Sequence, residues 1–379
     1  MNTEDNAPVR YFLFGTLRHL PLLEAVLGGP AVTEPATLAD HAVMRAAGHS
    51  FPILIRQPGA RAEGLLVHTD ADGAARLDLY EEGFDYKVTE VTVDTPAGPR
   101  TARLFASDDA PLRPDGPWDL DDWARRYAPA TVEAVPEVLD LARTQPFAVQ
   151  QARYPMVLAR ADSTLRARAH PAPATLRRSP AADDLQIDRL DRPYAQFFGV
   201  EEARMRFRRF DGSLSAPVRR AAFVMADAVT VLPYDAASDH VLLIEQHRFG
   251  PQVRGDPNPW SLEPIAGRID PGETPETTAA REAMEEAGLT LQALHPIAQC
   301  YPTPGAVTEY LYLFLALADL DQPRPSINGL ASEAEDIRNH HIPFAQLMAL
   351  IDSGEVQNGP LLASAFWLAL NRDRLRQQG

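Results

Sequence analysis

The segment Gly267–Leu289, GRIDPGETPETTAAREAMEEAGL, constrains the fold more than any other part of the chain. Its Pro-Gly pair predicts a turn, and either Thr274 or Thr277 can cap the helix that follows. We expect the helix to run to Ala287 and to end at Gly288, because glycine favours the left-handed conformation found after helices. The segment holds six carboxylates in a chain whose formal net charge is −16, so a compact structure must offset their repulsion.

Two of these acids lie one helical turn apart. Glu282 and Glu286 are i,i+4 neighbours, about 5–6 Å apart at Cβ in a helix, and a divalent cation between them would replace repulsion by attraction. Carboxylate oxygens with room for water suit Mg²⁺ or Mn²⁺. Arg281 is spaced to pair with Glu285, which leaves the other two acids for metal; the alternative is a solvated acidic helix face. The expected packed face of the helix is Ala280, Ala283, Met284 and Ala287.

The composition fits a two-domain globular enzyme. At 379 residues, with 45% hydrophobic and 23% charged residues, the chain can bury two ordinary cores. The acidic balance argues against nucleic acid or an anionic membrane as partner, since both attract clustered Lys and Arg. The longest apolar run, Tyr310–Ala318, is about half of a membrane helix, and no signal peptide is expected. One cysteine, Cys300, permits neither an internal disulfide nor a Cys-based zinc cluster, so we expect a cytoplasmic enzyme.

Patterns of apolar residues divide the chain into two folded parts. AEGLLVHT and KVTEVTVDT alternate as half-buried strands do, and a helical stretch follows from Trp118 to about Arg143. A stretch rich in Ala, Pro and charge, Ala167–Gln186, is interpreted as a linker or a loosely attached crossover, and we place the linker at 146–187, between domains at 1–145 and 188–379. Beyond it, AAFVMADAVTVLPYD, HVLLIEQHRF and EYLYLFLALADL predict strands, and two helices end the chain. Strands on both sides of a central helix predict an α+β sandwich.

The acidic segment also has the spacing of a known motif. Gly267, Glu273, Arg281-Glu282, Glu285-Glu286, Gly288 and Leu289 stand as in the Nudix box, with Ala283 where a larger aliphatic residue is common. LLIEQHRFG, WSLEPIAGRID, TPGAVTE and GLASEAEDI further resemble the ADP-ribose pyrophosphatase branch of the Nudix family, including the tellurite-resistance type. The resemblance covers about residues 190–379. It implies a C-terminal Nudix α/β/α sandwich.

The resemblance implies roles for the carboxylates. Glu282 and Glu286 would be metal ligands for Mg²⁺, or Mn²⁺, aided by the backbone carbonyl of Ala266. Glu285 would orient the ligands. A glutamate in a loop well after the box acts as general base in such enzymes, and Glu333 and Glu335 match that loop, with Glu335 favoured.

The resemblance also implies a substrate and its contacts. Metal-dependent hydrolysis of ADP-ribose to AMP and ribose 5-phosphate is the expected reaction, and a homodimer through residues near 190–230 is the expected assembly. Glu263 is interpreted as structural. The implied substrate-binding residues are Arg248, Arg219, Arg220, Arg268, Glu309 and Gly305.

The N-terminal part carries a second, weaker resemblance. Phe14-Gly15-Thr16-Leu17 and Glu81, with Tyr86 after it, resemble the gamma-glutamylcyclotransferase-like (AIG2-like) family, over about residues 8–145. The resemblance implies a mixed β-barrel with helices, in which Glu81 moves a proton for intramolecular attack of an amine.

Three functions stay open at this point. The first is the ADP-ribose hydrolase, with other nucleoside diphosphate-sugars as related substrates because the diphosphate machinery is shared. The second makes gamma-glutamylamine cyclotransferase activity of the N-terminal domain the main one, and a regulatory role for that domain is an equal alternative. The third is a ligand sensor with an inert Nudix fold.

Overall fold

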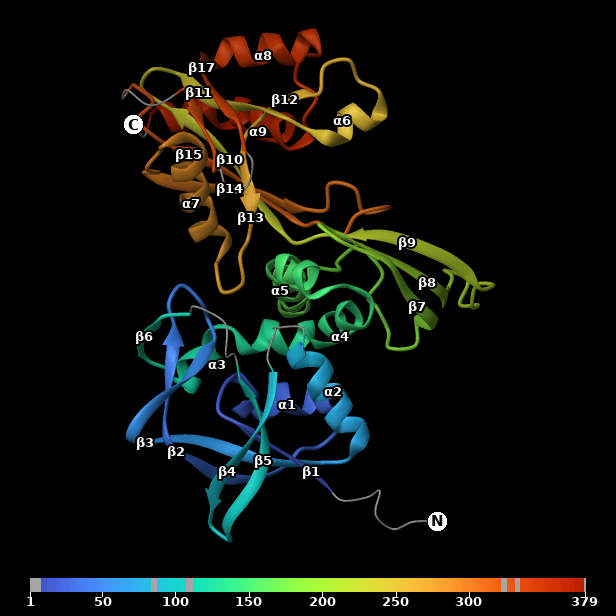
Figure 1. Ribbon diagram of the computed structural model, residues 1–379. Coiled ribbons are helices and arrows are strands. Elements are labelled where there is room, and N and C mark those ends of the chain that lie inside the picture. Colours follow the sequence, from blue (N-terminus) through green and yellow to red (C-terminus); the bar gives the residue numbers. More distant parts are fainter. Residues whose placement is uncertain (1–7, 83–86, 107–111, 322–325, 331–334, 378–379) are drawn as a thin grey trace. The chain divides into compact units, whose positions relative to one another are not determined.

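The chain folds into two compact units in a computed structural model (Figure 1). One unit comprises Met1–Pro173 with Ala195–Phe197, and the other Ala174–Tyr194 with Phe198–Gly379. The structure describes residues 8–82, 87–106, 112–321, 326–330 and 335–377. In this described part, no helix is long and apolar enough to span a membrane.

The first unit is built on a closed barrel. Strands β3, β1, β5, β4 and β2 follow one another around it, and β2 pairs again with β3 to close the ring. The β1–β5 pair is parallel and the others are antiparallel, which confirms the predicted mixed barrel. The strands are β1 (Val9–Leu13), β2 (Val32–Ala46), β3 (Pro52–Thr69), β4 (Lys87–Thr95), β5 (Gly98–Ala106) and β6 (Pro114–Pro117), the last an addition to the edge of β2.

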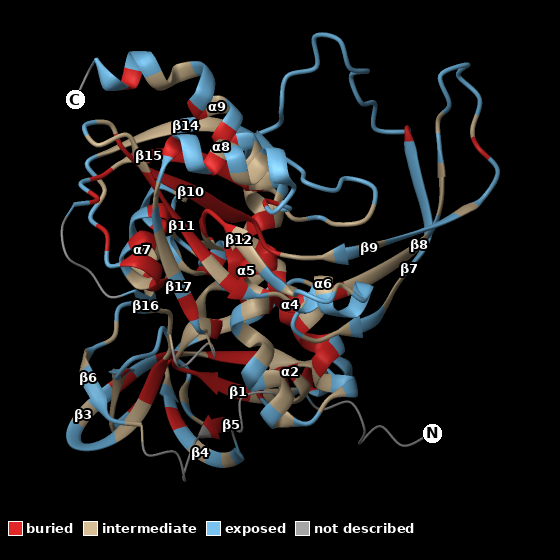
Figure 2. Cartoon of the chain, turned by 90° about the horizontal axis from the view of Figure 1, so that it is seen from above, coloured by how far each residue is buried: buried red, intermediate tan, exposed pale blue. Residues whose placement is uncertain are grey.

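Alternation along β1 supplies two cores in the first unit. Phe12 points into the barrel with Leu66 and Leu104, whereas Tyr11 and its neighbours two residues away pack beneath the helices. β1 is buried from Tyr11 to Leu13, as a strand covered on both sides must be, and it is drawn mainly in red in Figure 2. The helices are η1 (Thr16–Arg18), α1 (Leu20–Leu27), α2 (Ala71–Glu82), α3 (Leu120–Arg126), α4 (Ala128–Thr144) and α5 (Phe147–Ala169).

Helix α5 differs from the linker that the sequence analysis placed at 146–187. Its hydrophobic face consists mainly of small residues, such as Val157 and Ala161, which pack against α4. Arg160 is buried as well, in an ion pair with Glu137 of α4. An Ala- and Arg-rich sequence therefore forms an ordered helix, because small side chains permit close packing and the buried charge is paired. The helix expected from Trp118 to Arg143 is two helices that meet at Tyr127.

The second unit is centred on an eight-stranded sheet. Its main order is β14-β15-β10-β11-β17-β16, with β12 paired to β11 and β13 paired to β10. The strands are β10 (Ala228–Asp235), β11 (His240–His247), β12 (Trp260–Glu263), β13 (Ile265–Arg268), β14 (Ala293–Cys300), β15 (Leu311–Leu317), β16 (Ile327–Asn328) and β17 (Ile337–Pro343). Every residue of β10 is buried, as expected for a central strand whose two faces are both covered.

Helices cover both faces of this sheet, which confirms the α/β/α sandwich. On one face Val229 and Ile244 pack against α7 (Pro275–Ala287), and on the other Leu232 and Leu243 pack against α8 (Phe344–Ser353) and α9 (Gly359–Arg376). The separation of these helices on the two faces is visible in Figure 1. A smaller sheet consists of β7 (Leu185–Ala195), β8 (Gly199–Phe207) and β9 (Val218–Val224), and α6 (Phe249–Arg254) follows β11.

Candidate functional site

Helix α7 has the ends that the sequence predicts. The Thr274 hydroxyl accepts from the N–H of Thr277, and the Thr277 hydroxyl in turn accepts from the N–H of Thr274. Gly288 ends the helix with φ of 59°, a conformation that costs glycine nothing. This capping at both ends fixes the length and rotation of the helix that carries most of the acidic motif.

The buried face of α7 differs from the expected one. Ala283 and Ala287 are buried as predicted, but Ala280 is exposed and the Met284 side chain is half exposed. Ala279 and Glu286 take their places, so the buried stripe is rotated towards the acids. The sequence analysis was wrong because it treated a carboxylate as an outward residue. Glu286 is only 1% exposed and therefore faces the sheet.

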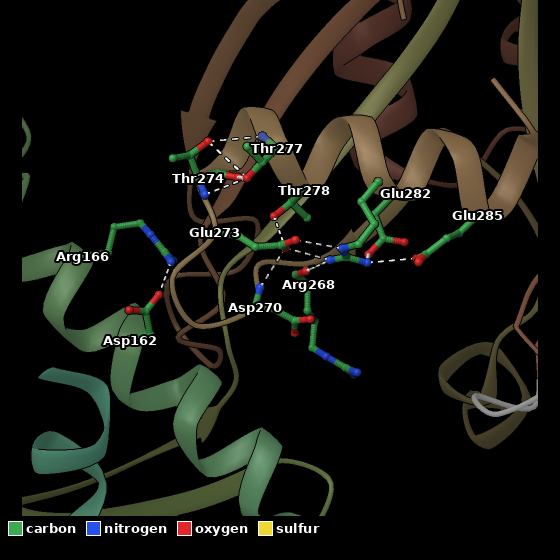
Figure 3. A network of polar contacts seen from close by, with 11 residues as sticks. Asp162, Arg166, Arg268, Asp270, Glu273, Thr274, Thr277, Thr278, Glu282 and Glu285 are labelled. Carbon is green, nitrogen blue, oxygen red and sulfur yellow. Dashed lines mark hydrogen bonds and ion pairs between the residues drawn. The ribbon is translucent and has the colours of Figure 1, made fainter. Parts of the chain in front are cut away.

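Arg281 connects three carboxylates. Its Nη1 donates to Glu282 Oε1 at 2.7 Å and to Glu285 Oε2 at 3.0 Å, and its Nε and Nη2 donate to the two oxygens of Glu273 at 3.1 and 3.0 Å. Nη2 also donates to the carbonyl of Arg268 at 3.1 Å, which ties the helix to the end of β13. Figure 3 shows Glu273, Glu282 and Glu285 turned towards this one guanidinium. The predicted pair with Glu285 is present, but Arg281 holds Glu282 as well.

Gly267 provides the space for Glu282. A Cβ at this position of β13 would lie 1.8 Å from Glu282 Oε1 and 1.9 Å from its carboxyl carbon. The glycine that opens the motif is therefore required for close approach, since the φ angle is not in the left-handed region. The side chain of Glu282 is only 12% exposed, and burial raises its pKa to about 7 against the attraction of Arg281.

Glu286 is held at the neighbouring residue of β13. Its Oε2 accepts from the N–H of Ala266 at 3.0 Å. Burial raises the pKa of Glu286 to about 9, opposed by that hydrogen bond and reinforced by the charges of Glu282 and Glu335. Two adjacent residues of β13, Ala266 and Gly267, thus hold Glu286 and Glu282 in place. Neither carboxylate has enough positive charge nearby to stabilise its ionised form.

The loop after β16 brings Glu335 into the same electrostatic environment. Its carboxylate accepts from the N–H of Leu330 at 3.1 Å, and its charge acts on both Glu282 and Glu286. Gly329 has φ of +106°, and a Cβ there would lie 2.8 Å from the Cβ of Glu335, so the turn needs glycine. Glu333, the other candidate base, lies outside the described residues.

Arg248 lies near these acids and is held by an acid that the sequence analysis treated as structural. Its guanidinium donates to both oxygens of Glu263 at 2.6 to 3.1 Å. Burial raises the pKa of Glu309, with Arg248 opposing the shift and Asp227 adding to it. Asp227 was missed by the sequence analysis. Its position directly before the fully buried β10 was the available signal.

The other predicted substrate contacts lie elsewhere or remain predictions. Arg219 and Arg220 are on the exposed β9, where Arg219 pairs with Glu202 of β8 at 2.9 Å. Arg268 ends β13 and gives its carbonyl to the Arg281 network. Gly305 is exposed, and a Cβ there would meet nothing within 4 Å, so packing does not require glycine at this position.

The carboxylate oxygens of Glu282 and Glu286 suit a hard cation that keeps part of its hydration shell. Among the described residues, no three His, Cys, Asp or Glu side chains are arranged to hold a metal alone. Mg²⁺ commonly takes one or two carboxylates and completes its shell with water and substrate phosphates. Glu282 and Glu286, beside the backbone of Ala266, fit that requirement, because both are largely buried carboxylates whose raised pKa values show that their ionised forms lack compensating positive charge.

Glu81 lies in the other unit, at a separate cavity. It is near the end of α2 and is 9% exposed. The cavity has a volume of about 480 Å³ and is also lined by Phe14, Gly15 and Thr16, so the fold brings the two parts of the weaker sequence resemblance together. Tyr86 lies outside the described residues.

Comparison with known proteins agrees with both assignments. A model of the NUDIX domain matches residues 225–364, and a model described as gamma-glutamyl cyclotransferase, AIG2-like, matches residues 11–125. The ADP-ribose pyrophosphatase of Escherichia coli (strain K12) is 34% identical over 196 residues, which are 52% of this chain and 93% of the relative. The GDP-mannose pyrophosphatase of Enterobacter sp. (strain 638) is 33% identical over 153 residues, 40% of this chain and 78% of the relative.

These similarities, together with the acidic helix on its sheet, show that the chain belongs to the Nudix hydrolase family. Within that family, the ADP-ribose pyrophosphatase of Haemophilus influenzae is a further relative, 34% identical over 186 residues, 48% of this chain and 85% of the relative. A solved structure described as an ADP compounds hydrolase is 22% identical with a TM-score of 0.41, covering 53% of this chain and 99% of that one.

Replacing Gly267 by alanine tests the close approach to Glu282. The added Cβ would force the carboxylate away from β13 and from Arg281, so we expect weaker Mg²⁺ binding and a stability loss of about 1–3 kcal/mol. Gly359→Ala is the matched control, because a Cβ there meets nothing within 4 Å. Calorimetric titration with Mg²⁺ and thermal unfolding measure both effects. Native metal affinity in Gly267→Ala would contradict the assigned role.

When a chelator keeps the protein free of metal, we expect Glu282 and Glu286 to make its stability depend on pH. The folded state binds protons on Glu282 and Glu286 more tightly than the unfolded chain does, so stability falls as pH rises from about 4.5 through about 7 and about 9. Scanning calorimetry should show a shallower fall for Glu286→Gln, and Mg²⁺ should reduce the fall in the native protein. Glu276→Gln, exposed on the same helix, should follow the native curve. An equally steep fall in Glu286→Gln refutes the assignment.

Proposed function

We propose that the C-terminal unit hydrolyses the diphosphate of a nucleoside diphosphate-sugar, with ADP-ribose as substrate and AMP and ribose 5-phosphate as products. One observation carries the proposal. Glu282, Glu286 and Glu335 come from α7 and a separate loop, yet they share one electrostatic environment with Arg248. The similarity to ADP-ribose pyrophosphatases over 93% of the Escherichia coli relative supports the choice of substrate.

We further propose that Glu282 and Glu286 hold Mg²⁺, with Mn²⁺ as the alternative. When bound, such an ion neutralises phosphate charge and lowers the pKa of bound water. The chain's own contribution is to hold the two carboxylates apart and oriented. Gly267 lets Glu282 approach β13, and the N–H of Ala266 fixes one oxygen of Glu286. Arg281 and Glu285 act as positioning residues for Glu282.

Glu335 is the proposed general base that takes a proton from the attacking water. Its loop is anchored by the reciprocal hydrogen bonds between Glu335 and Leu330, at 3.1 and 3.2 Å. A base held on a loop can adopt its final geometry when substrate binds. Arg248 is the proposed contact for a substrate phosphate or ribose, since Glu263 already aligns its guanidinium.

A second substrate class has specific support. The relatives include GDP-mannose pyrophosphatases at 32–33% identity, so GDP-mannose belongs in the substrate panel. A homodimer through residues near 190–230 also remains a proposal. It is supported by the exposed β7–β8–β9 sheet, on which Leu190, Phe207 and Phe223 are exposed hydrophobic residues.

Kinetic variants test the two carboxylate roles separately. Glu335→Gln should lower kcat on ADP-ribose by about 10²-fold or more while Mg²⁺ affinity stays near native, because only proton removal is lost. Glu286→Gln should weaken Mg²⁺ binding as well as turnover. Release of AMP and calorimetric Mg²⁺ titration measure these effects, with Glu276→Gln as the control on α7. Native turnover in Glu286→Gln, or no turnover of any nucleoside diphosphate-sugar by the native protein, would refute the proposal.

A further inference from the structure

Two parallel pairings in the second unit are separated by a short break. Strand β10 pairs with β15 from Ala228 and Leu311 onwards, and Phe223, near the end of β9, pairs with Val307 in an isolated parallel bridge. Ala228 lies five positions after Phe223, whereas Leu311 lies four positions after Val307. The first segment therefore has one extra residue, and this mismatch interrupts the ladder as a β-bulge does.

The hydroxyl of Thr308 spans this break. Phe223 has ordinary ladder bonds, because its N–H donates to the carbonyl of Ala306 at 2.8 Å and its carbonyl accepts from the N–H of Thr308 at 2.9 Å. At Met225, however, the Thr308 Oγ1 accepts from the N–H at 2.9 Å and donates to the carbonyl at 3.1 Å. One hydroxyl thus pairs both main-chain groups of Met225, which in an uninterrupted parallel ladder would bond to the neighbouring backbone.

Two acids lie within the break. Asp227 is 5% exposed, and Glu309 is partly buried. Burial raises the pKa of Glu309, the negative charge of Asp227 adds to the rise, and the positive charge of Arg248 opposes it. Keeping two carboxylates in one partly desolvated environment costs free energy, because their ionised forms repel each other. The local backbone must therefore hold them there.

The Thr308 contact is placed to hold this backbone. Thr308 directly precedes Glu309 in the chain, and Met225 lies two residues before Asp227. The hydroxyl contact closes the break at one end, and the β10–β15 ladder closes it at the other. Between these two fixed ends, the main chain that carries both acids has little room to move.

We propose that Thr308 is a positioning residue for the diphosphate hydrolysis proposed above, and the inference rests on that function. Its hydroxyl holds Glu309 beside Asp227, in the electrostatic environment of Arg248, so that the substrate meets acids already in place. Thr308 acts through Glu309 and does not touch the reacting atoms. Loss of the hydroxyl therefore weakens substrate binding and leaves the chemical step, which depends on the acids of α7 and on Glu335, nearly unchanged.

A matched set of threonine variants tests the hydroxyl. Thr308→Val keeps the branched shape but removes the partner of both main-chain groups of Met225. It should raise KM for ADP-ribose by about fivefold or more, with kcat within about twofold of native, because binding rather than chemistry is affected. Thr308→Ser keeps the hydroxyl and should restore a near-native KM. Thr303→Val makes the same change at an exposed residue of the same loop, whose hydroxyl makes no hydrogen bond within the described residues, and KM should stay native.

A double-mutant cycle tests whether Thr308 acts through Glu309. Glu309→Gln alone should raise KM, since it removes the charge that is proposed to meet the substrate. Adding Thr308→Val to Glu309→Gln should raise KM further by less than about twofold, because the group that the hydroxyl holds is already lost. Two effects that simply multiply would show that Thr308 has a structural role only, and would overturn the proposal.

Amide hydrogen exchange at Met225 measures the contact without reference to activity. The Met225 N–H should exchange at least about fivefold faster in Thr308→Val than in the native protein, Thr308→Ser or Thr303→Val, because its acceptor is gone. Equal exchange rates would overturn the contact itself. If the native protein hydrolyses ADP-ribose but Thr308→Val keeps the native KM, the positioning role is refuted and the proposed function stands. No turnover of any nucleoside diphosphate-sugar by the native protein refutes the proposed function, and the positioning role with it.

Discussion

The Nudix site depends on one guanidinium group, that of Arg281, which is shared by three carboxylates. Arg281 donates to Glu273, Glu282 and Glu285, so a single positive charge faces three carboxylates. Burial makes the ionised form of Glu286 costly, and the negative charges of Glu282 and Glu335 add to that cost. A second arginine, Arg248, is already engaged by Glu263. The site therefore has a deficit of positive charge, which the proposed divalent cation would offset.

The backbone around the acids explains why this deficit is tolerated. Strand β13 pairs with β10, which is buried on both faces, so its position is fixed by the core rather than by the site. In that fixed strand, Gly267 leaves space for the Glu282 carboxylate, and the N–H of Ala266 donates a hydrogen bond to Glu286. The capped α7 then determines the spacing of both acids. The stability of the sandwich thus supports an arrangement that is electrostatically unfavourable on its own.

Sequence patterns predicted helix α7 better than they predicted its surroundings. The limits of α7 and the pairing of Arg281 with Glu285 followed from local signals, the caps and the i,i+4 spacing, whereas the barrel and the α/β/α sandwich were implied by the family resemblances. The buried position of Glu286 could not be predicted from polarity, because charged side chains normally face solvent and this one faces the sheet. The predicted linker at 146–187 overlaps helix α5 because its start was placed well before the Ala- and Pro-rich stretch at 167–186, and the packing of α5 through alanines and the paired Arg160 has no local signal. Two parts of the cavity wall, the Phe14–Leu17 loop and Glu81, were named by the sequence resemblance, but the wall from α5 depends on contacts between distant segments and has no local signal.

Each unit contains a buried glutamate, Glu81 in the first and Glu286 in the second, and the surroundings of the two side chains differ. Burial raises the pKa of both Glu286 and Glu81, but their neighbours differ. Glu286 has other acids and an arginine network around it, so a bound cation can favour its ionised form. Glu81 is surrounded by rings, without Lys or Arg among the described lining residues, so its neutral form is favoured and can both donate and accept a hydrogen bond. Burial alone therefore does not define the chemistry of a carboxyl group; the charges and surfaces around it decide whether its ionised or its neutral form is favoured.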